Sequence, residues 1–161
     1  MRIILILLVL SQCSIKNELS EWETIFNGKN LDGWTVKVKG YPSGDNFGNT
    51  FKVVDEAIQV SYENYNNFDF KFGHIYYTEK KYKNYHLKLE YKFFGNQAIG
   101  GEGWATKNSG IMFHSQHPET MLIDQSFPVS LEAQFLGGLG DGKRPTGNLC
   151  TPGTVSYTHL R

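Results

Sequence analysis

The stretch "SLEAQF" (residues 130–135) alternates apolar and polar residues with the period of two that is typical of a β-strand. Its apolar residues share one face and its polar residues share the other: Leu131, Ala133 and Phe135 against Glu132 and Gln134. The sequence therefore predicts a half-buried strand whose open face carries one carboxylate beside one amide. Enzymes that hydrolyse ordinary glycosides usually need two carboxylates, so a single acid at this place raises a question of mechanism.

The same alternation recurs along the chain and predicts further strands. They are expected in "GWTVKVKG" (33–40), where Trp34, Val36 and Val38 alternate with polar residues, and in two short runs around a turn at Asp55-Glu56. Further strands are expected in "GHIYYTEKKYKNYHLKLEYKFF" (73–94), where the alternation covers 86–93, and in "SGIMFHSQ" (109–116). Turns rich in Gly, Asn and Asp separate these runs, and no stretch keeps a helical period for three turns. Short strands at regular spacing in a chain with 17 glycines predict an all-β fold, an antiparallel β-sandwich or jelly roll.

Composition and charge are those of a single globular domain. Of the 161 residues, 40% are hydrophobic and 20% are charged, which provides enough apolar side chains for a core. Basic and acidic residues balance at 16 each, and the longest basic run is the short "EKKYK" at 79–83. Nucleic-acid binding is therefore not expected.

The N-terminus has the features of an export signal. Arg2 precedes an apolar run over 3–10, which is shorter than the roughly 20 residues that a membrane helix needs but suits a secretory signal. Cys13 follows this run, as in bacterial lipoprotein signals, where the cysteine is acylated; ordinary signal-peptidase cleavage nearby is the alternative. Residues 1–19 are thus expected to be a signal and linker, and the protein to be exported to the bacterial periplasm, outer membrane or cell surface.

The C-terminus breaks the pattern of the rest of the chain. The tail "VSYTHLR" (155–161) resembles translated sequencing-adaptor read-through, so we expect a domain over 20–154 that is incomplete at its C-terminal end. Apart from Cys13, Cys150 is the sole cysteine of the chain. It is expected to be either a small buried hydrophobic residue or the partner of a cysteine in chain beyond this sequence.

Common catalytic motifs are missing from the sequence. It contains no G-x-S-x-G, no paired-cysteine motif and no H-E-x-x-H. The glycine-rich "GGEGWATKNSG" (100–110) lacks the Lys-Ser/Thr ending of a phosphate-binding loop. We expect it to form the rim of a binding site, with Trp104 available to stack on a sugar ring.

Alternation predicts that three polar side chains leave the core on the same side. If the strands at 109–116 and 130–135 are neighbours, His114 can meet Glu132 and Gln134 in one patch on the open face. Each of these residues alone reads equally well as an ordinary surface side chain. Glu90 and Lys92 could share that face or form a simple cross-strand surface pair.

Several motifs together resemble the 3-keto-disaccharide hydrolase family, which has a concanavalin-like jelly-roll fold. The similarity spans about residues 22–154, and the last strands of the family lie beyond it. The motifs are "IFNGKNLDGW" (25–34), "EYKF" (90–93), "NSGIMFHSQ" (108–116), "LEAQFLGG" (131–138) and "TGNLCTPGT" (146–154).

This resemblance implies a route that needs one carboxylate. A ketone at C3 of the sugar acidifies the C2–H bond, so a single base can remove that proton, the C1 leaving group departs by elimination, and water adds. Glu132 would be the base or a metal ligand, His114 a metal ligand or acid, and Gln134 an orienting or enolate-binding amide. A divalent metal ion is a possible cofactor. The expected substrate-binding residues are Trp104, Asn108, Glu90 and Lys92.

The expected substrate is thus a 3-keto-glycoside or 3-keto-disaccharide that a partner oxidoreductase produces. Three alternatives stay open from the sequence, because a fold does not fix a function. The first is a lectin-like carbohydrate-binding module without catalysis, and the second is an ordinary glycosidase whose second carboxylate lies elsewhere. The third is a structural surface protein without a ligand.

Overall fold

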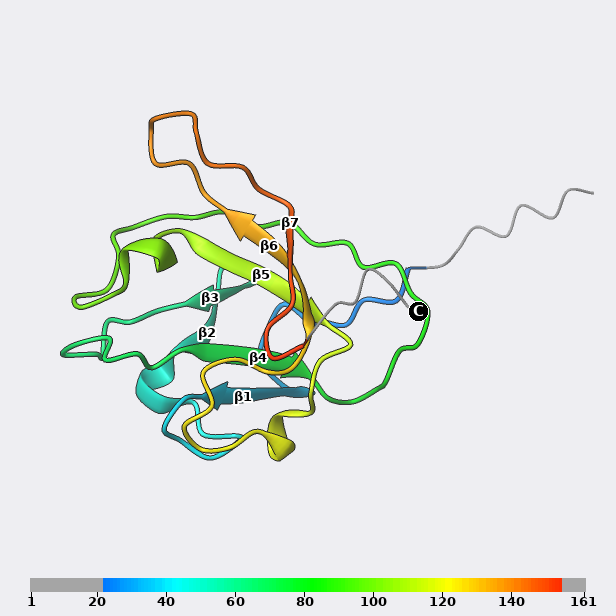
Figure 1. Cartoon of the computed structure of the whole chain (residues 1–161). Helices are drawn as coiled ribbons and strands as arrows, with labels where there is room; N and C mark the ends of the chain where they lie inside the picture. The colour runs from blue at the N-terminus through cyan, green and yellow to red at the C-terminus, as the bar shows by residue number, and fades with distance from the viewer. Residues whose placement is uncertain (1–21, 155–161) are drawn as a thin grey trace, which may run out of the picture.

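The structure, a computed structural model, describes residues 22–154 (Figure 1). The predicted export segment with Cys13 and the predicted tail over 155–161 lie outside the described residues. Within 22–154, no helix has the length and apolar character needed to cross a membrane.

The described chain is all-β and its sheets are antiparallel, as predicted. Strand β1 pairs with β4, β2 pairs with β3, and β5, β6 and β7 form a three-stranded sheet in that order. No α-helix occurs among the described residues, which contain three short 3-10 helices. The elements are β1 (Trp34–Val38), η1 (Phe47–Asn49), β2 (Phe51–Val54), β3 (Ala57–Val60), β4 (Gly73–Tyr77), η2 (Gly103–Ala105), β5 (Asn108–Phe113), η3 (Pro118–Thr120), β6 (Leu131–Leu136) and β7 (Asn148–Cys150).

The predicted turn at Asp55-Glu56 connects β2 to β3. Val54 pairs with Ala57, so the hairpin loop has two residues, and both have positive φ angles of 48° and 59°. This left-handed geometry gives a loop whose twist matches that of the two strands. Asp is among the residues that tolerate it best.

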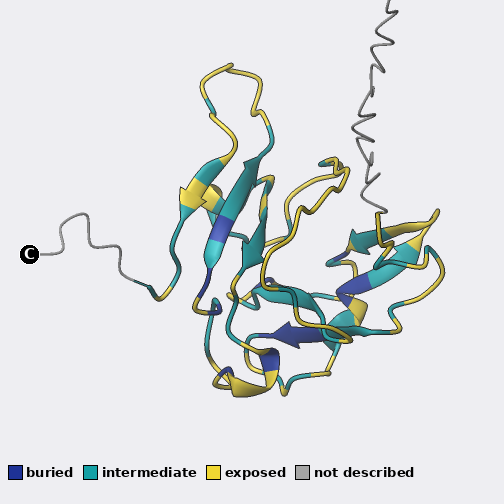
Figure 2. Ribbon diagram, turned by 90° about the vertical axis from the view of Figure 1, so that its right-hand side faces the viewer, coloured by how far each residue is buried: buried dark blue, intermediate teal, exposed yellow. Residues whose placement is uncertain are grey.

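The hydrophobic core lies between β1–β4 and the β2–β3 hairpin. Val36, Val38 and Phe51 are buried there, and Ile75, which is the partner of Val36 across the β1–β4 pair, packs against them. Figure 2 shows the dark blue of buried residues in β1, whereas the loops are mostly yellow. The predicted alternation of Trp34, Val36 and Val38 against the polar residues of β1 is confirmed at the two valines, which are buried.

Lys37 belongs to the polar residues of β1, yet it does not meet solvent. Its side chain is fully buried, and its Nζ donates hydrogen bonds to the carbonyls of Val38 (3.0 Å), Tyr41 (2.8 Å) and Ile123 (3.0 Å). The ammonium group thus uses all three of its donors, and burial lowers the pKa of Lys37. This face of β1–β4 is covered by the chain that follows η3.

His74 is the partner of Lys37 across the β1–β4 pair, and it lies under the same cover. Its ring meets that of Phe127 edge to face at 5.7 Å between centroids. Burial, followed by the positive charge of Lys37, lowers the pKa of His74 to about 4. The imidazole is therefore neutral at physiological pH.

The segment over 85–94 does not form the strand that its alternation predicts. From residue 79 to residue 97, the main chain makes no hydrogen bond to any other described backbone group. Tyr91 stacks on Phe135 of β6 at 4.3 Å, yet Leu87 and Leu89 stay 45% and 43% exposed. A strand needs a neighbour to satisfy its backbone groups, and residues 22–154 provide none beside this segment, so the prediction of a paired strand was wrong for this part of the chain.

Candidate functional site

Glu132 lies in the middle of the three-stranded sheet. In the strand register it faces Met112 of β5 on one side and Cys150 of β7 on the other. Directly opposite residues of antiparallel strands project to the same side of a sheet, so these three side chains form a row across it. β7 was not predicted, because its sequence is flanked by Gly and Pro and reads as turns.

A second row lies beside the first and contains two amides. Gln134 faces Gly110 of β5 and Asn148 of β7, and the Nδ2 of Asn148 donates a hydrogen bond of 3.2 Å to the Oε1 of Gln134. The predicted neighbourhood of Glu132 and Gln134 on one face is therefore present. Asn148 is an additional polar residue of this face that sequence reasoning missed, since β7 was not recognised.

Gly110 leaves the space that the side chain of Glu132 occupies. A Cβ atom at position 110 would collide with the Glu132 carboxylate, and it would lie only 2.8 Å from Cγ of Glu132 and 2.9 Å from the carbonyl oxygen of Ala133. Glycine inside a strand often marks such a close approach of another group. The glycine of the "NSGIMFHSQ" motif is thus explained by the carboxylate that lies over it.

The environment of Glu132 favours its protonated form. The residue is only 9% exposed, although the sequence placed it on the open face of the strand. Leu131, Ala133 and Phe135, which were expected to be buried on the other face, are half-buried. The Glu132 carboxylate accepts no hydrogen bond from a described residue. Within 22–154, the buried side-chain oxygen and nitrogen atoms that lack a hydrogen-bond partner are Ser43 Oγ and Tyr82 OH, so the oxygens of Glu132 are not among them. The carboxylate oxygens therefore keep contact with solvent, and burial raises the pKa of Glu132.

Cys150 lies next to this carboxylate as a free thiol. Burial raises its pKa, and the negative charge of Glu132 raises it further. A thiol must lose its proton to act as a nucleophile or as a metal ligand, so both effects disfavour the reactive form of Cys150. Cys150 is thus a small half-buried packing group in the described chain.

None of the described contacts of His114 involves Glu132, which the sequence placed in one patch with it. His114 follows the end of β5 with a left-handed φ of 50°, and it is exposed. Its ring lies 6.0 Å from that of Phe113 and 6.4 Å from that of Tyr85. The left-handed backbone interrupts the alternation on which the prediction rested.

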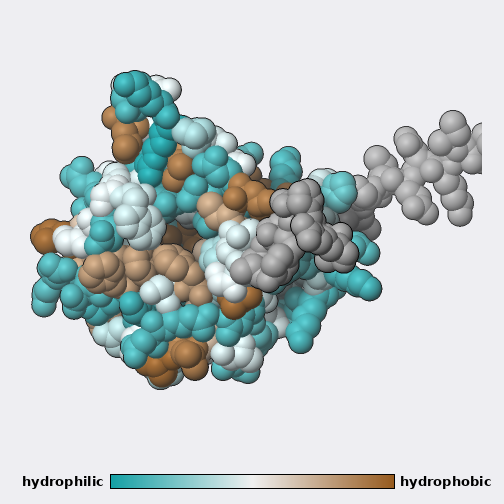
Figure 3. All heavy atoms as spheres, viewed as in Figure 1, coloured by the Kyte–Doolittle hydropathy of each residue, from teal (hydrophilic) through white to brown (hydrophobic). Residues whose placement is uncertain are grey.

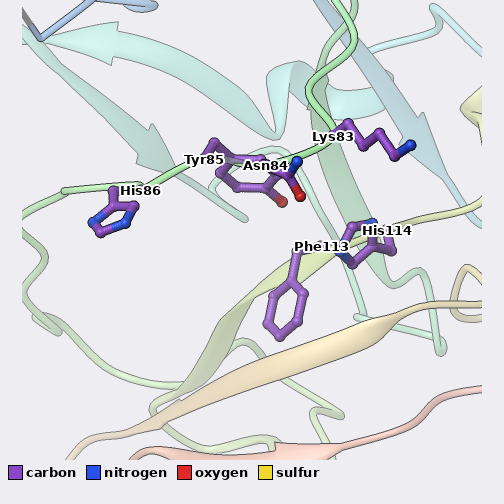
Figure 4. Close-up of a pocket in the computed structure, with 6 residues that line it drawn as sticks. All are labelled: Lys83, Asn84, Tyr85, His86, Phe113 and His114. Atoms are coloured by element: carbon purple, nitrogen blue, oxygen red, sulfur yellow. The ribbon is translucent and has the colours of Figure 1, made fainter. Parts of the chain in front are cut away.

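The hollow that His114 lines is a separate feature, shown in Figure 4. It has a volume of about 630 Å³, and neither Glu132 nor Gln134 contributes to its wall. Its lining residues are Lys83, Asn84, Tyr85, His86, Phe113 and His114.

A metal site at the predicted ligands does not fit this arrangement. Residues 22–154 contain no group of three or more His, Cys, Asp or Glu side chains that are placed to hold a metal ion. His114 and Glu132 were the expected ligands. His114 lines the hollow, whereas Glu132 is not one of its lining residues. The polar side chains that the described strands bring together on this face are therefore those of Glu132, Gln134 and Asn148.

Trp104 lies in η2 and is 54% exposed, which agrees with its expected place on a rim. One side of its ring stacks on Phe72, at 5.6 Å between centroids. Asn108 was expected to contact substrate, but its Nδ2 donates a 3.2 Å hydrogen bond to the carbonyl of Trp104. Asn108 thus holds the rim in place.

Glu90 and Lys92 lie on the unpaired segment and are both exposed. The Nζ of Lys92 lies 6.0 Å from the ring centre of Phe94, and no ion pair within the described residues includes either side chain. Both side chains therefore meet solvent in the described chain.

A family model described as "3-keto-alpha-glucoside-1,2-lyase-like domain" matches residues 21–159. The chain belongs to this family. The match covers all seven strands together with Glu132, Gln134 and Trp104, and it confirms the resemblance that the motifs indicated. No curated protein and no solved structure matches the chain.

Proposed function

We propose that this protein cleaves 3-keto-glycosides and that Glu132 removes the proton from C2 of the keto sugar. The observation that supports this most is the single carboxylate at the centre of the β5–β6–β7 sheet, with a raised pKa and no cationic partner. A carboxylate whose pKa is raised toward neutrality is a stronger base when ionised. The membership of the 3-keto-glucoside family supplies the substrate class.

The reaction needs only one base because the ketone activates the substrate. Glu132 takes the C2 proton, and the electron pair of the C–H bond moves into an enolate with its charge on the C3 oxygen. The enolate then collapses: the C1–O bond breaks, a C1=C2 double bond forms, and the leaving alkoxide takes up a proton. Water adds to C1 while C2 regains a proton, so the net reaction is hydrolysis.

In this proposal Gln134 acts on the developing charge. Asn148 donates to its Oε1, and its own Nε2 donates to no acceptor within residues 22–154. This free donor lies on the same face as Glu132 and supplies a hydrogen bond for the C3 oxygen as it becomes an enolate. Hydrogen bonds that are fixed before the reaction stabilise such charge efficiently.

The test is the activity of Glu132→Gln on a 3-keto-disaccharide, in comparison with Glu90→Gln as the matched control. The Glu132 variant keeps the shape and loses the proton acceptor, so kcat should fall by about 10²-fold or more. The control removes an exposed carboxylate of the unpaired segment and should retain activity. Equal activity of the two variants would remove Glu132 from the mechanism.

A lectin-like binding function is the second candidate, and the exposed Trp104 is the observation that favours it. Binding of a disaccharide without any release of product, in both the original chain and the Glu132 variant, would support this reading over the enzymatic one.

The place of the reaction is part of the same proposal. The signal-like N-terminus supports an exported protein that is anchored by a lipid on Cys13 and that receives keto sugars from an oxidoreductase. Cell fractionation tests this: Cys13→Ala should leave the membrane fraction, and its retention there would contradict lipid anchoring.

A further inference from the structure

Three aromatic side chains from distant parts of the sequence meet at one rim of the molecule. Phe72 precedes β4, Trp104 lies in η2, and Phe127 precedes β6. The ring centre of Phe72 lies 5.6 Å from Trp104 and 4.9 Å from Phe127, and the latter two are 6.4 Å apart. Figure 3 shows a band of apolar colour on the side of the molecule that faces the viewer. We call these three residues the aromatic rim.

Arg144 holds this rim in position from the loop between β6 and β7. Its Nη2 donates to the carbonyl of Trp104 (3.1 Å), and its Nη1 donates to the carbonyls of Thr106 and Gly137. The planar guanidinium thereby joins η2 to the end of β6. Together with the hydrogen bond from Asn108, it fixes the backbone of Trp104 from two sides. An exposed aromatic ring on a fixed backbone binds a ligand with a small loss of conformational entropy.

The aromatic rim lies at one end of the face that carries Glu132. Asn108, Gly110 and Met112 share that face by alternation, and Asn108 contacts the loop of Trp104. Met112 is the partner of Glu132 and follows Asn108 by four residues in β5. The distance from Asn108 to Met112 along the strand is therefore about 13 Å at the usual rise per residue. This separation is comparable to a sugar of two pyranose rings.

We infer that the aromatic rim is a subsite for the leaving-group sugar, with Trp104 as the stacking residue and Arg144 as its positioning residue. The apolar C–H face of a neutral pyranose fits an aromatic ring, whereas the polar edge of the sugar stays in water. The ring with the ketone must place its C2 at Glu132, so the rim receives the other ring. The identity of the ligand as a glycoside rests on the proposed function.

Because the rim receives the unoxidised ring, its binding can be measured without the reaction. Trehalose titrated into the Glu132→Gln chain should give binding heat by calorimetry. A further Trp104→Ala change should weaken this binding by roughly tenfold, as the loss of an aromatic contact does. Trp22→Ala is the matched control, because Trp22 is also a highly exposed tryptophan, and it should have no effect. Equal binding by the Trp104 and Trp22 variants would overturn the inference.

The role of Arg144 is tested by a double-mutant cycle in the same background. Arg144→Lys should weaken trehalose binding but add little to the effect of Trp104→Ala, because the arginine acts through the tryptophan. Lys143→Gln is the control. Additive losses in the double variant would contradict a positioning role. If trehalose binds as expected and 3-keto sugars are not cleaved, the subsite is supported and the proposed function is contradicted. If 3-keto sugars are cleaved and Trp104→Ala has no effect on cleavage, the proposed function is supported and the subsite is contradicted.

Discussion

At the scale of single residues, the burial of Glu132 links function to stability. A carboxyl group whose pKa is raised in the folded state disfavours folding once it ionises, so stability falls as the pH rises above the ordinary Glu value of 4.5. Glu132→Gln removes this cost. The variant should therefore unfold at a higher temperature than the original chain at pH 7 and at a similar temperature at pH 4.

Thermal unfolding at the two pH values measures this difference directly. Glu90→Gln serves again as the control, since its carboxylate is exposed. A Glu132 variant that is less stable than the original chain at pH 7 would show that the carboxylate has a stabilising partner, contrary to the structure.

Gly110 is the second residue with a clear consequence. Its replacement by Ala places a Cβ against the Glu132 carboxylate and the carbonyl of Ala133, and such overpacking typically costs about 1–3 kcal/mol. We predict lower stability in urea unfolding together with loss of activity, because the carboxylate must move. Gly138→Ala is the control, because no atom lies within 4 Å of the added methyl group and Gly138 does not have a positive φ. Equal stability of the two variants would contradict the close packing of Glu132 over Gly110.

At the scale of elements, the sequence predicted where strands lie better than it predicted which strands pair. Alternation located β1, β2, β3, β5 and β6 and the turn at Asp55-Glu56, because hydrophobic periodicity is a local signal. Pairing depends on whether another strand lies beside the segment in the folded chain, which local alternation does not reveal. Among the described residues, no strand lies beside 85–94, and this segment is unpaired. The prediction for His114 has another limit: alternation holds only while the backbone stays extended, and it does not at φ 50°.

The segment at 85–94 gives a prediction at this scale. Its amides have no main-chain partners, so their hydrogens should exchange with solvent much faster than those of β6, which pairs on both sides. Hydrogen exchange followed by mass spectrometry of peptides over 85–94 and 131–136 tests this. Protection of 85–94 that equals the protection of β6 would mean that a strand pairs with it.

At the scale of the whole molecule, two of the sheets have different roles. The β1–β4 sheet carries the hydrophobic core on one face and is closed by the chain after η3 on the other, whereas the β5–β6–β7 sheet presents Glu132 and Gln134. Three of the five motifs by which the family was recognised from sequence contain β5, β6 and β7 of this second sheet. The contributions of Asn148, Arg144 and Gly110 could not be recognised, because they depend on β7, on a loop contact and on the β5–β6 register, which exist only in the folded chain.

The central claim is that Glu132 abstracts the C2 proton of a keto sugar, and the direct measurement is the fate of that hydrogen. When a 3-keto-disaccharide is cleaved in D₂O, mass and NMR spectra of the released keto sugar at early times should show deuterium at C2, because solvent supplies the returning proton. Glu132→Gln should abolish this incorporation together with cleavage. A product that carries only hydrogen at C2, or cleavage of the unoxidised disaccharide at a comparable rate, would contradict the account.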